Sequence, residues 1–68
     1  MNKQLNTELE QLLDRYTATA VMRELHDVCL EKAMHIEMNW QDAPLASVWN
    51  KLAGTLAKSV TVATDHKI

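Results

Sequence analysis

The sequence predicts an all-α fold of three helices, at about residues 7–16, 19–40 and 43–58. Two observations support this prediction. Pro44 and Gly54 are the only proline and the only glycine among 68 residues, whereas a sheet with several tight turns needs more of both. Apolar residues also recur every three or four positions over long stretches, which is the period of an amphipathic helix.

The first helix is expected to begin at Thr7. Thr7 and Glu10 have capping-box spacing, in which each side chain satisfies a free backbone N–H of the other residue. The run Thr17–Thr19 then interrupts the apolar pattern, and either threonine can cap a new helix. We therefore expect a break or kink between the first two helices, with one continuous helix over 7–40 as the alternative.

A chain reversal is expected at residues 40–44. Asp42 is a good N-cap, and Pro44 suits the first turn of a helix, where its missing N–H costs little. The second and third helices should form an antiparallel hairpin closed by Trp40 and Trp49, with the first helix packed across it. This prediction gives a single helical domain over 1–58, followed by a frayed tail over 59–68 that is rich in β-branched residues.

The core of this domain is predicted from the apolar positions that share one face of each helix. These residues are Leu9, Leu12, Leu13, Tyr16, Leu25, Val28, Cys29, Ile36, Trp40, Trp49, Leu52 and Leu56. Gly54 lies within the third helix, away from this face. It either allows another helix to approach closely or is a tolerated imperfection.

The second helix carries an additional apolar stripe opposite its core face. Leu30, Met34 and Met38 are spaced four residues apart, so they stack on one side of the helix. Arg23 and Asp27 fall on the same side. A helix in a small domain normally needs one apolar stripe, so these five residues are the predicted interface of a homodimer built as a helical bundle.

Composition narrows the class of protein further. Seven Lys+Arg against nine Asp+Glu give a net charge of −2, which disfavours direct nucleic-acid binding, because such modules carry a basic surface. The single cysteine, Cys29, excludes a disulfide within the chain and suits the reducing cytoplasm. No apolar run approaches the ~20 residues that span a bilayer, so we expect a soluble cytoplasmic protein that does not enter the membrane.

Residues with chemical potential are few. His26 and Cys29 lie three apart on the second helix, close enough to share a metal or for the imidazole to deprotonate the thiol. A buried structural cysteine is the ordinary alternative. No phosphate loop, catalytic triad or zinc-ligand spacing is present, so neither an enzyme nor a bound cofactor or metal is expected.

The run from Cys29 to Asp42 contains Cys-x-x-Lys-Ala-x-His followed by Asn-Trp-Gln-Asp. It resembles a segment in short bacterial proteins, cyanobacterial and phage-borne ones especially, that have no assigned function. The resemblance covers roughly residues 7–58 and implies a second amphipathic helix after Asn-Trp-Gln-Asp. Many of those proteins have glycine at the position of Thr17, which implies a helix break there, but this chain lacks the glycine.

The expected function is that of a small interaction or adaptor module acting through a homo-oligomeric helical interface, with a further protein partner unidentified. One alternative is a nucleic-acid-associated or transcription-related module, since three short helices can build a helix-turn-helix. The second alternative is a thiol or metal sensor at Cys29 and His26.

Overall fold

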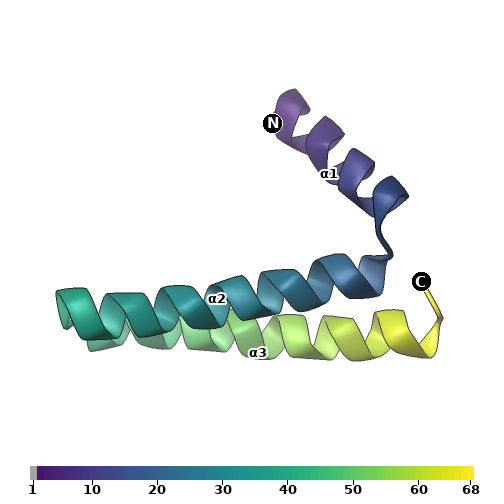
Figure 1. Ribbon diagram of the computed structural model, residues 1–68. Helices are drawn as coiled ribbons and strands as arrows, with labels where there is room; N and C mark the ends of the chain where they lie inside the picture. The colour runs from purple at the N-terminus through teal and green to yellow at the C-terminus, as the bar shows by residue number, and fades with distance from the viewer. Residues whose placement is uncertain (1) are drawn as a thin grey trace.

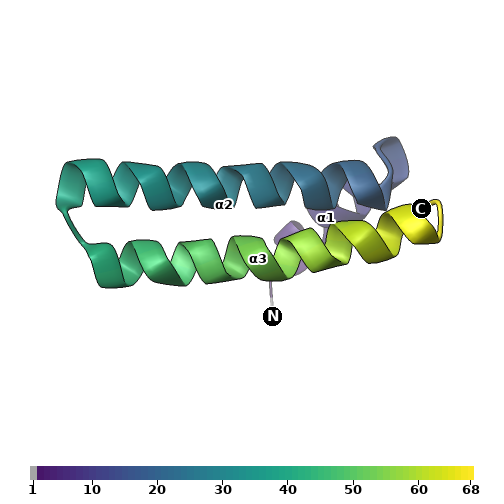
Figure 2. The same cartoon turned by 90° about the horizontal axis from the view of Figure 1, so that it is seen from below.

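The computed structural model describes residues 2–68 and contains three helices in that range: α1 (Lys3–Arg15), α2 (Ala18–Trp40) and α3 (Ala43–Asp65). The helices α2 and α3 run antiparallel and side by side over their whole length (Figure 2). The helix α1 projects from the start of α2 at a steep angle (Figure 1). The predicted all-α class and the helical hairpin are therefore confirmed.

The first helix begins four residues earlier than predicted. Asn2 is its N-cap, and the Asn2 side chain accepts a hydrogen bond from the backbone N–H of Leu5 at 2.9 Å. Thr7 lies inside the helix, where its hydroxyl donates to the carbonyl of Lys3 at 2.9 Å. The prediction of a capping box at Thr7 is thus wrong, because an asparagine is at least as good a cap as a threonine.

The break between α1 and α2 is confirmed, and a continuous helix is excluded. Tyr16 and Thr17 both have extended backbone angles. The Thr17 hydroxyl then accepts a hydrogen bond from the N–H of Ala20 at 3.0 Å, which makes it the N-cap of α2. A connection of two extended residues directs α1 away from α2.

The reversal between α2 and α3 is also as predicted. Gln41 adopts a left-handed conformation with φ 51° and ψ 32°, which ends α2. The Asp42 carboxylate accepts a hydrogen bond from the N–H of Leu45 at 3.0 Å, and Pro44 occupies the first turn of α3.

The third helix continues to Asp65, so the expectation of a frayed tail over 59–68 is wrong for most of that segment. Val60 and Ala63 pack toward α2, where Ala63 is buried and Val60 half-buried. The chain end is also held: the N–H of Ile68 donates to the carbonyl of Ala63 at 3.0 Å, and the Ile68 carbonyl accepts from the N–H of Thr19 at 3.1 Å. Tertiary contacts here outweigh the weak helix propensity of β-branched residues.

Small side chains form the interface between α2 and α3, which we call the seam. Among the residues that the structure describes, five are buried: Cys29, Ala33, Ala46, Ala53 and Ala63. Along the seam, buried and half-buried positions alternate in steps of three and four on both helices, as in a coiled coil; they are Met22, His26, Cys29, Ala33 and Ile36 on α2 and Ala46, Trp49, Ala53, Leu56, Val60 and Ala63 on α3. Four further half-buried residues lie outside this pattern: Ala18, Thr19, Val21 and Ser59. Alanines at the contact let two helix axes approach closely.

Between residues 2 and 68, none of the helices combines the length and the apolar character needed to cross a lipid bilayer.

Candidate functional site

Because alanines fill the seam, most of the large apolar side chains lie outside it. Val21, Leu25 and Val28 of α2 flank the seam on one side, and helical periodicity places Leu45, Val48 and Leu52 of α3 on the same side of the hairpin. We call these six residues the apolar face. All but Val21 are exposed. The expected burial of Leu25, Val28 and Leu52 is therefore wrong for a single chain.

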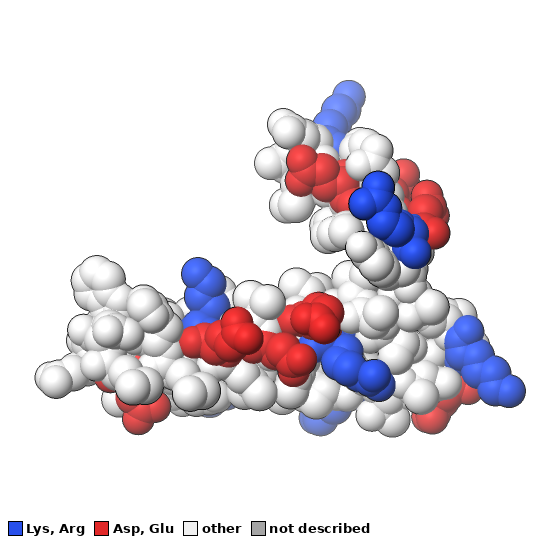
Figure 3. Space-filling view, in the orientation of Figure 1, with Lys and Arg blue, Asp and Glu red and all other residues white. Residues whose placement is uncertain are grey.

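The helix α1 stands over this apolar face. It lies on one side of the hairpin, seen above it in Figure 1 and behind it in Figure 2. It meets the hairpin only through α2, where the two helices join, and within residues 2–68 it makes no contact with α3. Figure 3 shows mostly uncharged surface around that joint, and acidic side chains gathered along the middle of α2.

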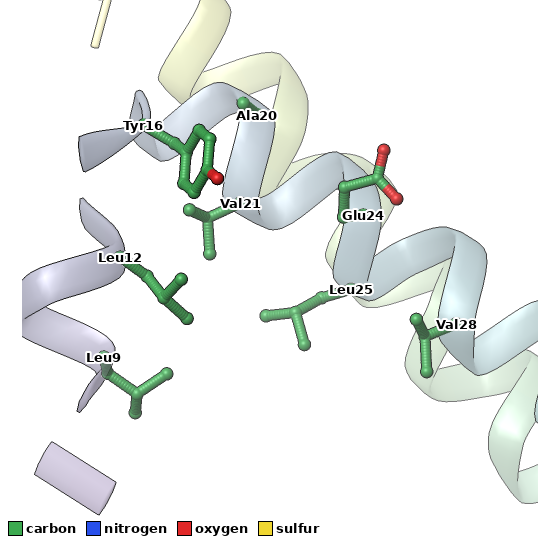
Figure 4. A pocket seen from close by; sticks show the side chains of 8 residues that line it. All are labelled: Leu9, Leu12, Tyr16, Ala20, Val21, Glu24, Leu25 and Val28. Carbon is green, nitrogen blue, oxygen red and sulfur yellow. The ribbon is translucent and has the colours of Figure 1, made fainter.

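An open cleft of about 410 Å³ separates α1 from α2. Leu12 and Leu25 point toward one another across it (Figure 4). Apart from Glu24 and the phenol of Tyr16, its walls are purely aliphatic; the lining residues are Leu9, Leu12, Tyr16, Ala20, Val21, Glu24, Leu25 and Val28. Such a surface can exclude water from an apolar partner, and it offers few polar groups that could orient a small substrate.

The wall contributed by α1 is a regular stripe. Leu5, Leu9, Leu12 and Tyr16 follow one another in steps of four, three and four residues, which is the spacing of a coiled-coil seam. All four are exposed, Leu9 by 41% and Tyr16 by 53%. The expectation that Leu9, Leu12, Leu13 and Tyr16 form the core against the hairpin is thus wrong in one chain, because the extended connection turns α1 away.

The stripe predicted as the interface lies on the opposite face of the hairpin. Leu30, beside the seam, is 37% exposed, and Met34 and Met38 are 62% and 75% exposed. Arg23 and Asp27 are exposed as well. Helical periodicity places Asn50, Gly54 and Ala57 of α3 next to this stripe, so the surface is narrower and more polar than the apolar face.

The two tryptophans do not close the hairpin together. Trp49 is half-buried in the seam, whereas Trp40 at the turn is exposed by 73%. Cys29 is buried, and Ile36 and Leu56 are half-buried. The structural difference between the tryptophans follows from the left-handed residue after Trp40, since α2 ends there and α3 does not cover its last side chain.

His26 and Cys29 both belong to the seam. The ring Nδ1 of His26 lies 3.1 Å from a carboxylate oxygen of Asp27, and the Cys29 thiol is buried and free. His35 is occupied elsewhere, since its ring nitrogen lies 3.1 Å from the side-chain nitrogen of Asn39. In the part of the chain that the structure describes, no three His, Cys, Asp or Glu side chains are close enough together to hold a metal ion.

The spacing of small residues from Ala46 to Ala63 signals the seam, and the predicted core does not include these alanines. The spacing of Leu9, Leu12 and Tyr16 predicts an apolar face on the first helix, and the structure adds Leu5 to that face and leaves it exposed. No protein-family model, no curated protein and no solved structure matches this chain.

Proposed function

We propose that this protein is a small protein–protein interaction or adaptor module that acts through a homo-oligomeric helical interface. One observation carries the proposal: the chain exposes 5602 Å² of surface, whereas a folded monomer of 7.7 kDa normally exposes about 4,300 Å². The difference of roughly 1,300 Å² exceeds the ~800 Å² that each partner buries in a stable interface of standard size.

The chemistry of the exposed surface supports association. The α1 stripe and the apolar face together present ten large apolar or aromatic side chains: Leu5, Leu9, Leu12, Tyr16, Val21, Leu25, Val28, Leu45, Val48 and Leu52. Exposed apolar side chains gathered on one side of a protein mark interaction sites. Within residues 2–68, the buried core of one chain consists of Cys29 and four alanines. Chains of this size are commonly stabilised by oligomerisation.

This interface differs from the one that the sequence alone suggests. The face with α1 supports the proposal better than the stripe of Leu30, Met34 and Met38, because α3 extends the apolar surface on the first face only. The role is one of binding rather than catalysis. The free thiol of Cys29 suits a reducing compartment, and we place the module in the cytoplasm.

Static light scattering over a dilution series tests the proposal. We expect a mass of at least twice the 7.7 kDa of one chain at micromolar concentration, falling toward one chain on dilution. A mass of one chain up to several hundred micromolar would contradict the proposal.

A further inference from the structure

We propose that the cleft between α1 and the hairpin is filled by α1 of a second copy, and reciprocally, so that two chains form an arm-exchanged dimer. This inference rests on the homo-oligomeric function proposed above and assigns that interface to particular helices. Each copy carries an apolar arm, which is the helix α1 with its stripe of apolar side chains. Each copy also carries an unfilled apolar cleft. An interface in which the same surfaces of two copies cover each other is the one that two-fold symmetry produces.

The dimensions of the chain favour a second copy as the occupant. Its radius of gyration is 13.8 Å, whereas a globular domain of 68 residues has about 10.9 Å and one of 136 residues about 14.2 Å. One chain is therefore already as extended as a globule made of two chains. This is expected when each chain reaches across the dimer.

The length of α1 also argues against closure within one chain. Its 13 residues span about 20 Å, whereas the 23 residues of α2 span about 35 Å. Because α1 joins the hairpin at the end remote from the turn, it can reach only the nearer part of the apolar face. Leu45 and Val48 lie close to the turn and would stay uncovered, whereas the arm of a second copy can enter from that end.

The composition of the cleft allows two copies to meet. Glu24 is the only acidic or basic side chain among the lining residues, and it is exposed to solvent. Inserting the Leu5, Leu9, Leu12 and Tyr16 stripe of a second copy therefore places no like charges inside the interface. The coiled-coil spacing of that stripe suits packing into the grooves of the hairpin.

X-ray scattering combined with light scattering distinguishes the arrangements. The arm-exchanged dimer predicts twice the mass of one chain with a radius of gyration of about 14 Å. A mass of one chain at about 11 Å would show that α1 closes onto its own hairpin. A mass of one chain at 13.8 Å would show an open monomer. Either monomer overturns both the inference and the proposed function.

Isotope-filtered NMR on a mixture of labelled and unlabelled chains tests the exchange itself. We expect intermolecular cross-peaks between the methyl groups of Leu9 or Leu12 in one copy and those of Leu25 or Val28, which line the cleft, in the other. A dimer in which α1 shows only intramolecular contacts with the hairpin overturns the exchange and leaves the proposed function intact.

A pair of matched substitutions provides a second test. Leu9→Glu places a charge in the cleft and should weaken dimerisation by about 30-fold or more, the change expected on losing a central interface side chain. Met34→Glu makes a similar change on the opposite face and should leave the dimerisation constant within about twofold. Circular dichroism checks that both variants remain helical. If Met34→Glu weakens dimerisation and Leu9→Glu does not, the inference is overturned and the interface lies on the stripe of Leu30, Met34 and Met38.

Discussion

Gln41 has a backbone conformation that suits glycine better than glutamine. Its φ of 51° and ψ of 32° lie in the left-handed region, where a side chain costs about 1–2 kcal/mol relative to glycine. Glycine is the commonest residue at this position after a helix. The turn after Trp40 therefore stores strain that a single substitution can remove.

We predict that Gln41→Gly raises the free energy of unfolding by about 1 kcal/mol, measured by urea denaturation. The matched control is Asn50→Gly, an exposed position within α3, where glycine should instead lower the stability by roughly 0.3 kcal/mol. Equal losses at both sites would contradict the assignment of strain to Gln41.

Gly54 lies in the middle of α3, and its immediate surroundings within the chain are open. A Cβ atom built on it meets no heavy atom within 4 Å. Gly54→Ala should therefore stabilise the helix by about 0.5–1 kcal/mol, which raises the melting temperature by several degrees in a protein of this size. Circular dichroism recorded during thermal unfolding measures the change in melting temperature. A lower melting temperature would favour the other interpretation of this glycine, a close approach by a neighbouring molecule.

At the scale of elements, the seam depends on the small size of its side chains. Ala53 is 1% exposed, so Ala53→Leu adds three carbon atoms where α2 and α3 meet. We predict a loss of about 1–3 kcal/mol in unfolding free energy, the usual cost of overpacking, measured by chemical denaturation. Ala57→Leu is the matched control on the exposed side of α3 and should change stability by less than about 0.5 kcal/mol. A similar loss of stability in both variants would contradict the assignment of Ala53 to the contact between α2 and α3.

The ends of the helices show what local sequence can predict. Thr17, Asp42 and Pro44 act through hydrogen bonds and backbone angles within a few residues, so the break and the reversal were predictable. The end of α3 was not, because Val60 and Ala63 are helical through contacts with α2. The seam was predicted only in part. Cys29, Ile36, Trp49 and Leu56 belong to it as expected, whereas large side chains such as Leu25 and Leu52 were expected to be buried at contacts that alanines occupy.

At the scale of the whole molecule, the amount of apolar surface was predictable and its location was not. The sequence shows that one helix carries more apolar residues than a single seam can bury, which predicts association. Which face remains open depends on the direction of α1. That direction is set by the extended angles of Tyr16 and Thr17, and the apolar pattern of the helices does not encode it. The candidate interface is therefore the face that carries α1, and the sequence alone had suggested the opposite face, which carries Met34.

If two chains complete each other's core, thermal stability must depend on protein concentration. A tenfold increase in concentration stabilises a dimer by about 1.4 kcal/mol. With an unfolding entropy of about 2.1 cal/mol/K per residue over two chains, we expect the melting temperature to rise by about 5 °C. Calorimetry from 10 to 100 μM measures this rise. The Leu9→Glu variant is the control, and it should melt at a lower temperature than the wild-type protein at every concentration because its dimer is weaker. A wild-type melting temperature that stays constant over this range would show that each chain folds alone.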